Sequence, residues 1–161
     1  MTAAEYNLCV EKYADGIYRF ILKNLGDQDK AKDVVQDTYE KLWMKLEGVG
    51  FEKSKSYLFT TAYHTMIDMI RKEKRNTSLE ELTQVSYTNT NQYTDLNEVL
   101  HEAINQLPAV QRSVILLRDY EGYSYEEIAE ITALSESQVK VYIFRGRSFL
   151  RQYIGSLENV L

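Results

Sequence analysis

The sequence predicts an all-α protein of two small helical domains joined by a polar linker. Only seven glycines and one proline occur among 161 residues, which leaves little material for the tight turns of a sheet. Apolar residues instead recur at spacings of three and four, the period of amphipathic helices. Segment 76–95, NTSLEELTQVSYTNTNQYTD, lacks both long apolar periodicity and basic residues. It predicts a tether between domains 1–75 and 96–161, and a mobile loop within one domain is the alternative.

Composition narrows the class of protein. The apolar content of 44% is ordinary for a soluble globular chain, and no uninterrupted apolar run approaches the roughly 20 residues of a membrane helix. The amino terminus has no basic region followed by an apolar one, so no secretory signal is expected. The single cysteine, Cys9, cannot form an internal disulfide, which is typical of a reducing compartment. The sequence therefore predicts a cytoplasmic protein.

Three helices are expected in the first domain. The first runs from Tyr6 to Leu25, is stopped by Gly26, and is followed by Asp27 as the next N-cap. Its predicted core stripe consists of Tyr6, Val10, Tyr13, Ile17, Ile21 and Leu25.

The second helix extends to Gly48 and has an apolar face opposite a charged one. Spacing alone favours a solvated role for its charged face, which consists of Asp33, Gln36, Asp37, Glu40 and Lys41. A third helix, from about Ser56 to Arg75, ends in the basic stretch IRKEKR. Basic residues are favoured at the carboxyl end of any helix, so this stretch alone says little about nucleic acid.

The second domain is predicted to contain a helix-turn-helix. A helix is expected over 96–107, and Pro108 follows it, where a new helix can begin. The next stretch, AVQRSVILLRDYEGY, continues this new helix, which is expected to stop at Gly122. Two capping boxes follow, Ser124 with Glu127 and Ser135 with Gln138. Two short capped helices joined by a tight turn, here TALS, are typical of a helix-turn-helix, whose second helix lies in the major groove.

The second helix of this motif is purely cationic in an acidic chain. Between residues 137 and 157 it carries Lys140, Arg145, Arg147 and Arg151 and no carboxylate, although the formal net charge of the chain is -5. Duplex DNA attracts such local positive charge because it carries about one negative charge per 1.7 Å of axis. The alternative is a solvated amphipathic helix, since the same segment supplies apolar residues to a core.

Three stretches together resemble one protein family, the bacterial sigma factors. AKDVVQDTYEKLW resembles their core-polymerase-binding helix, SYLFTTAYHTMIDMIRKEKR their promoter-melting helix, and YEGYSYEEIAEITALSESQVKVYIFRGRSFL their minus-35-reading helix-turn-helix. The three occur in the family's order, with nothing upstream of the first helix and only a short tether between the domains. The chain therefore resembles the smallest class, the extracytoplasmic-function (ECF) sigma factors.

The resemblance implies site residues and partners. The first domain would bind core polymerase and melt the minus-10 element, and the second would read the minus-35 element. Polymerase-binding residues would be Asp33, Gln36, Asp37 and Lys41. Minus-10 residues would be Lys53, Lys55, Ser56, Tyr57, Phe59, Tyr63, His64, Asp68 and Arg71, with stacking on aromatics to hold flipped bases. Minus-35 residues would be Ser135, Glu136, Ser137, Gln138, Lys140, Tyr142, Arg145 and Arg147.

Some positions depart from the family pattern. Tyr57 stands where Trp is usual, His64 where Asn is frequent, and Tyr142 where Arg is common, so base preference does not carry over. The implied partners are core RNA polymerase, promoter DNA and a membrane-linked anti-sigma factor. No metal, cofactor or small-molecule substrate is implied.

Two other classes compete with this interpretation. Glu98 and His101 form one E-x-x-H pair, but carboxylate-bridged di-iron bundles need two such pairs. The other histidine, His64, has Thr61 three residues before it, where a second pair would require Glu. An enzyme is therefore not expected. The serious alternative is a helix-turn-helix regulator with an N-terminal sensing or dimerising domain, which would bind duplex DNA as a dimer without polymerase.

Overall fold

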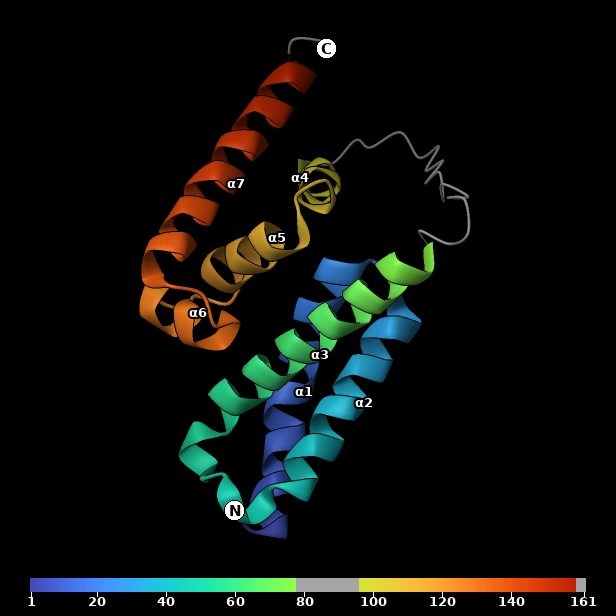
Figure 1. The fold of residues 1–161 in the computed structure, drawn as a ribbon, viewed down its shortest axis with the longest axis vertical. Helices are drawn as coiled ribbons and strands as arrows, with labels where there is room; N and C mark the ends of the chain where they lie inside the picture. Colours follow the sequence, from blue (N-terminus) through green and yellow to red (C-terminus); the bar gives the residue numbers. More distant parts are fainter. Residues whose placement is uncertain (78–95, 159–161) are drawn as a thin grey trace.

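The computed structural model of the protein describes residues 1–77 and 96–158, and these ranges contain helices and no strand (Figure 1). The N-terminal bundle comprises α1 (Ala3–Leu25), α2 (Gln28–Met44), the 3-10 helices η1 (Leu46–Gly48) and η2 (Phe51–Lys53), and α3 (Ser54–Thr77). The C-terminal bundle comprises α4 (Leu96–Asn105), α5 (Ala109–Ile115), the π-helical turn η3 (Leu116–Tyr120), α6 (Tyr125–Thr132) and α7 (Glu136–Glu158). The all-α fold class is confirmed. No described helix is long and apolar enough to cross a membrane.

The start of α1 is fixed by a cap that lies before the predicted helix. Thr2 Oγ1 accepts a hydrogen bond from the Glu5 amide at 3.1 Å, and Glu5 Oε1 accepts one from the Thr2 amide at 2.9 Å. This reciprocal pair satisfies two amides that the first turn leaves without partners. The helix therefore begins at Ala3 and not at Tyr6.

The core stripe of α1 also differs from the prediction at one position. Val10 remains 36% exposed, whereas its neighbour Cys9 is completely buried. The hydroxyl of Tyr39, on α2, donates to the Cys9 carbonyl oxygen at 2.9 Å. Because α2 packs on the Cys9 side of α1, the buried stripe is rotated by one residue there.

Local hydrogen bonds determine where α2 and α3 begin. Asp27 caps α2 as predicted, since its Oδ1 accepts from the amides of Asp29 and Lys30. The helix ends at Met44 instead of Gly48, and two short 3-10 turns lead into α3. Ser54 Oγ donates to the Phe51 carbonyl oxygen at 2.6 Å, which adds the turn that starts α3 two residues early.

The helix-turn-helix forms as predicted, and both of its predicted capping boxes are present. Ser124 Oγ accepts from the Glu127 amide and Ser135 Oγ from the Gln138 amide, each at 3.1 Å. In return, Glu127 Oε1 accepts from the Ser124 amide and Gln138 Oε1 from the Ser135 amide, each at 3.0 Å. Ala133 ends α6 with φ 59°, in the left-handed region that glycine adopts more easily. Ile128, Val139 and Ile143 are buried between the two helices of the motif and its bundle.

One glycine allows α7 to pass close to α5. A Cβ atom on Gly146 would lie 2.6 Å from Ile115 Cδ1 and 3.0 Å from its Cγ1. Only a residue without a side chain fits this crossing without displacing Ile115. The close approach fixes the direction of α7, which extends beyond the rest of the C-terminal bundle in Figure 1.

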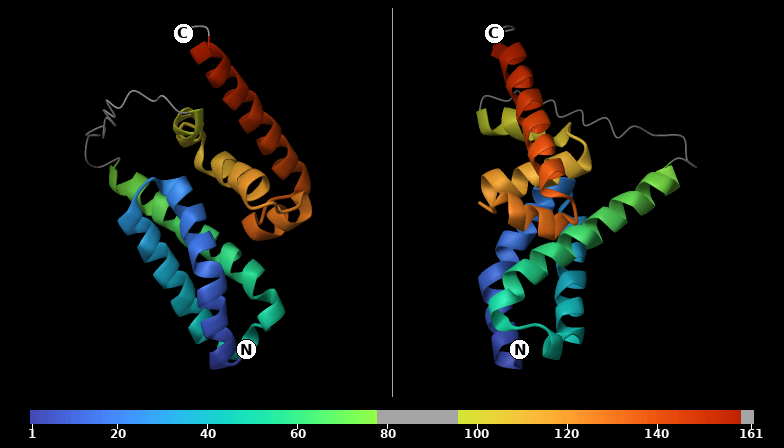
Figure 2. Two further views of the ribbon diagram at one scale, coloured as in Figure 1. Left: turned by 180° about the vertical axis from the view of Figure 1, so that it is seen from behind. Right: turned by 60° about the vertical axis from the view of Figure 1, so that its left-hand side comes forward.

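The two bundles contact each other directly. Figure 2 shows α6 lying against α3. Ser113 Oγ on α5 donates to Asn24 Oδ1 on α1 at 2.7 Å, and both side chains are buried. Phe59 on α3 lies between Phe20 of its own bundle, at 5.7 Å, and Tyr123 of the other, at 5.5 Å between ring centroids. Of the predicted linker 76–95, residues 78–95 lie outside the described residues.

Candidate polymerase and nucleic-acid interfaces

An exposed polar strip runs along α2. Asp33, Gln36, Asp37, Glu40 and Lys41 are all exposed, as the spacing predicts. Their carboxylates form none of the salt bridges found among the described residues. The Lys41 Nζ instead donates to Thr65 Oγ1 on α3 at 2.8 Å, so this residue also ties α2 to α3.

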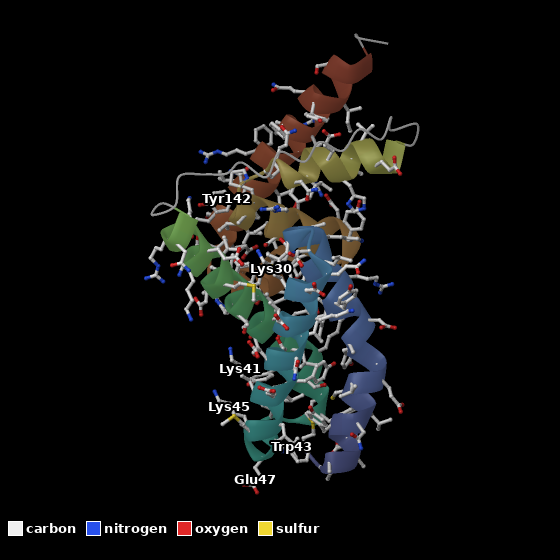
Figure 3. All side chains as sticks on the ribbon, turned by 90° about the vertical axis from the view of Figure 1, so that its right-hand side faces the viewer. Lys30, Lys41, Trp43, Lys45, Glu47 and Tyr142 are labelled. Atoms are coloured by element: carbon white, nitrogen blue, oxygen red, sulfur yellow. The ribbon has the colours of Figure 1, made fainter. Side chains whose placement is uncertain are left out.

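Two large apolar side chains extend this strip toward the end of α2. Trp43 is 53% exposed and Met44 is 83% exposed. Trp43 lies at the end of α2 beside the start of α1 (Figure 3), where its ring meets that of Tyr6 edge-on at 5.0 Å. Residues 43 and 44 follow 36, 37 and 40 at helical spacing, and this periodicity could have identified them from the sequence. We call residues 33, 36, 37, 40, 41, 43 and 44 the α2 strip.

Apart from Tyr57, the predicted minus-10 residues fall into two groups. One group is exposed along the start and outer face of α3 and consists of Lys53, Lys55, Ser56, His64, Asp68 and Arg71. Tyr57 is half-buried, so its ring is partly accessible. Phe59 and Tyr63 form the second group, with only 2% and 4% of their surface exposed.

Contact with the C-terminal bundle contributes to the burial of Phe59. Phe59 packs on Tyr123, and the ammonium of Lys55 lies 5.1 Å from the centre of the same ring. Burial raises the pKa of Tyr63, Arg71 partly lowers it, and Tyr142 on α7 raises it again. In this arrangement neither Phe59 nor Tyr63 presents a ring face on which a base could stack.

The first turn of α7 uses part of its predicted DNA-binding set for its own cap. Ser135 and Gln138 bond to each other's backbone amides. The Lys140 ammonium lies 3.7 Å from the Glu136 carboxylate in an exposed pair one turn apart. Ser137 is exposed and faces solvent between them.

The two arginines further along α7 differ in environment. Arg147 Nη2 donates to Asp119 Oδ1 at 2.6 Å and its Nε to Oδ2 at 3.4 Å. This two-point bond to Asp119 raises the pKa of the guanidinium. Arg145 is exposed. Arg147 therefore forms an ion pair within the C-terminal bundle. Helical periodicity could not predict this pair, because Asp119 is 28 residues away in the sequence.

Two apolar side chains on the outer face of α7 were missed by the sequence reasoning. Phe144 is 68% exposed and Val141 is 44% exposed, one helical turn apart. They flank Lys140 and Arg145 on the face opposite the buried Ile143. Apolar side chains in the major groove contact the thymine methyl group, so these two residues can take part in base reading.

The described ranges hold no group of three or more His, Cys, Asp and Glu side chains arranged for a metal ion. Glu98 and His101 are therefore not part of any such group among the described residues.

Comparison with known proteins places this arrangement in a family. The model described as Sigma-70 region 2 matches residues 9–76, and that of Sigma-70 region 4 matches residues 97–150. RNA polymerase sigma factor SigV of Bacillus subtilis is 32% identical over 146 residues, which cover 89% of this chain and 87% of SigV. ECF RNA polymerase sigma factor SigM of the same organism is 27% identical over 146 residues, covering 88% of this chain and 90% of SigM. The chain belongs to the ECF RNA polymerase sigma factors.

A solved structure of similar sequence agrees with this assignment. The sigma factor RpoE from Bartonella quintana, in complex with the anti-sigma factor NepR, superposes with a TM-score of 0.78 at 26% identity, covering 93% of this chain and 96% of that one. CnrH, solved with the cytosolic domain of CnrY, has a TM-score of 0.67 at 20% identity over 94% of this chain and 88% of that one, which supports the fold alone.

The assignment decides between the two transcription-factor interpretations. An N-terminal sensing or dimerising domain is wrong, because residues 9–76 are Sigma-70 region 2. As a sigma factor the protein acts in transcription initiation with core RNA polymerase and promoter DNA.

Proposed function

We propose that each step of initiation is carried out by a separate surface of this sigma factor. The α2 strip docks on core RNA polymerase, the loop before α3 and the outer face of α3 capture the minus-10 element, and α7 reads the minus-35 element. Residues 1–75 and 96–161 then act as two functional domains joined by residues 76–95. The α2 strip is the observation that carries the proposal.

The composition of the α2 strip is that of a protein-binding surface. Exposed Trp and Met side chains are uncommon on a helix that only contacts water, and both residue types are enriched in interface cores. Here Trp43 and Met44 are rimmed by the carboxylates of Asp37 and Glu40. An apolar centre with a charged rim gives a partner both affinity and electrostatic specificity.

The geometry of α7 supports reading of duplex DNA. In a helix-turn-helix the amino-terminal residues of the second helix contact base edges and the first helix crosses the backbone. The cap at Ser135 fixes the direction from which α7 would enter the groove. Ser137, Lys140, Val141 and Phe144 face outward for base contacts, and Arg145, about one turn beyond Val141, faces outward for a phosphate.

The minus-10 surface offers cations and an exposed part of an aromatic ring along α3 and the turn before it. Lys53, Lys55 and Arg71 can follow a phosphate backbone, while Tyr57 can stack on a flipped base. Phe59 and Tyr63 join this set only when the C-terminal bundle leaves α3.

Three further features belong to the same proposal. The protein contributes no catalytic group of its own and supplies promoter contacts to the polymerase. Transcription takes place where DNA and polymerase are, so the site of action is the cytoplasm. An anti-sigma protein restrains it, supported by the likeness to RpoE in its complex with NepR.

Charge reversal on the α2 strip tests the proposal. Asp37→Arg should weaken binding to core polymerase by about 1–3 kcal/mol, because one charge-assisted contact is lost and a repulsion is gained. Asp15→Arg on α1 makes the same change of charge at an exposed position outside the strip, and its affinity should equal that of the wild type. Titration of labelled core polymerase measures both. Equal affinities for wild type and Asp37→Arg would refute the docking surface.

A further inference from the structure

Three cations of the C-terminal bundle interact with one residue, Tyr125, at the start of α6. The Arg118 guanidinium carbon lies 4.6 Å from the centre of the Tyr125 ring, and the Lys140 ammonium lies 5.8 Å from it. Both distances are within the range of about 6 Å at which a ring attracts a cation. Asp119 raises the pKa of the Arg147 guanidinium most strongly, and Tyr125 raises it further. Tyr125 thus connects the π-helical turn η3 with two turns of α7.

Tyr125 lies at the junction of the two helices of the helix-turn-helix. It is the first residue of α6, directly after the Ser124 cap, and its side chain is half-buried. Helix α6 and the start of α7 lie side by side (Figure 1). In a helix-turn-helix the first helix crosses the phosphate backbone, while the amino-terminal part of the second helix contacts base edges. The ring therefore lies where these two kinds of DNA contact meet.

Arg118 is held in a position suited to a backbone phosphate. Its Nη1 donates to the Tyr123 carbonyl oxygen at 2.9 Å, which uses one of the five N–H groups of a guanidinium. This hydrogen bond and the ring of Tyr125 restrain the guanidinium together, while the side chain stays partly exposed. Arg118 forms none of the salt bridges found within residues 1–77 and 96–158. A restrained guanidinium with further N–H donors matches the geometry of a phosphate.

Lys140 is restrained more weakly than Arg118. Its ammonium lies 3.7 Å from the Glu136 carboxylate, and both side chains of this pair are more than half exposed. An exposed ion pair is weak and restrains a long lysine side chain only in part. The ring of Tyr125 attracts the same ammonium from the side of α6. The direction in which Lys140 approaches a base edge therefore depends on Tyr125.

We propose that Tyr125 is a positioning residue for promoter binding, whose ring holds Arg118 for a backbone phosphate and Lys140 for a base edge. The inference rests on the proposed function, in which α7 reads the minus-35 element. Phosphate contacts fix the register of a protein on duplex DNA, and base contacts select the sequence. By holding one cation of each kind, the ring couples the register to the reading of bases. Tyr125 acts through these two cations and not through a DNA contact of its own.

Single variants of the full-length chain, each assembled with core polymerase, test this role. Tyr125→Leu removes the ring but keeps an apolar side chain, and Tyr125→Phe keeps the ring without the hydroxyl. Arg118→Ala and Lys140→Ala remove the two positioned cations one at a time. Tyr120→Leu is the matched control, because the ring of Tyr120 holds the Lys23 ammonium of α1 at 3.8 Å, and Lys23 is no part of the proposed DNA surface.

Two quantities are measured with duplexes selected from a library whose minus-35 region is randomised. The first is the slope of log affinity against log salt, and the second is the ratio of affinities for the best sequence and its single-base-pair substitutions. Arg118→Ala should make the slope shallower by about 0.9 and leave the ratio unchanged. Lys140→Ala should lower the ratio at one base pair about fivefold or more. Tyr125→Leu should show both effects, whereas Tyr125→Phe and Tyr120→Leu should match the wild type.

Failure of this inference and failure of the proposed function give different results. If Arg118→Ala and Lys140→Ala show their effects while Tyr125→Leu matches the wild type, the ring positions neither cation, and the proposed function stands. If Lys140→Ala leaves the ratio unchanged at every base pair, Lys140 does not read bases. That result refutes its role in the proposed function together with the inference.

A second substitution separates attraction of the cations from simple packing of the ring. Pentafluorophenylalanine at position 125 keeps the shape of an aromatic side chain but removes the negative ring face that attracts cations. This variant should show both effects of Tyr125→Leu, with thermal unfolding recorded in parallel. If it matches Tyr125→Phe instead, the ring acts by packing alone and the inference is wrong, even where Tyr125→Leu fails to fold.

Discussion

Arg145 and Arg147 lie two residues apart on α7, and the structure gives them different roles. Arg145 is exposed, while Arg147 is bonded at two points to Asp119, with the two side chains 43% and 39% exposed. A phosphate must compete with Asp119 for Arg147 but can approach Arg145 directly. We expect only Arg145 to contribute a full counterion-releasing contact to promoter binding.

The expected magnitudes follow from these environments. Arg145→Ala removes one phosphate contact, so the slope of log affinity against log salt should become shallower by about 0.9. Over a roughly fourfold rise in salt, the wild type should lose about 3.5 times more affinity than the variant. Arg147→Ala should leave this slope unchanged. It removes an exposed ion pair and should lower the stability of the C-terminal bundle by about 0.2–1 kcal/mol.

The assay is binding of the holoenzyme to duplex promoter DNA over a range of salt concentrations. Thermal unfolding of the variants is measured in parallel. Arg151→Ala removes another exposed arginine from α7 further from its first turn, and it serves as the control for the loss of one charge. Equal reductions of the salt slope by Arg145→Ala and Arg147→Ala would show that Asp119 does not restrain Arg147, and the distinction would be wrong.

Three further predictions concern other parts of the chain. Trp43→Ser with Met44→Ser should weaken core binding about tenfold or more, while the lost Trp43–Tyr6 ring contact should lower the stability of the N-terminal bundle by only about 0.5–1.5 kcal/mol; unchanged core binding would contradict this. Ala133→Gly should stabilise the C-terminal bundle by about 0.5–1 kcal/mol, since Ala133 has φ 59°, and an unchanged or lower denaturation midpoint would contradict this. The hydrogen bond from the Ser124 amide lowers the pKa of Glu127, so the ionised carboxylate stabilises the fold at a pH above its unfolded-state pKa, and this stabilisation is lost as the pH falls through the lowered pKa of the folded state. Glu127→Gln should flatten this acid dependence of the free energy of unfolding, measured by denaturant titration at several pH values, and an unchanged pH profile would be evidence against it.

Local chemistry made most of the fold predictable. Helix periodicity and the capping residues Asp27, Ser124 and Ser135 are short-range signals, and each of these caps forms as expected. The errors at the helix ends have equally local causes. Thr2 adds a cap before the first predicted turn, and the Ser54 hydroxyl donates to the Phe51 carbonyl oxygen at the start of α3.

Long-range packing was not predictable in the same way. The sequence places Phe59 on α3 but does not show that Tyr123 of the C-terminal bundle packs on it. Likewise, the sequence shows Arg147 as another cation of α7 but does not show its ion pair with Asp119. Both contacts join residues far apart in the chain, and periodicity carries no information about such pairs. The roles of the individual site residues remain predictions.

The most direct test of the central claim is run-off transcription with purified core RNA polymerase. Core polymerase is captured on beads, incubated with the wild-type chain, washed, and supplied with genomic DNA fragments and nucleotides. We predict that the chain is retained with the polymerase and that defined transcripts appear only when it is present. Identical transcripts with and without the chain, or a stable dimer of the chain that binds duplex DNA while failing to associate with core polymerase, would contradict its action as a sigma factor.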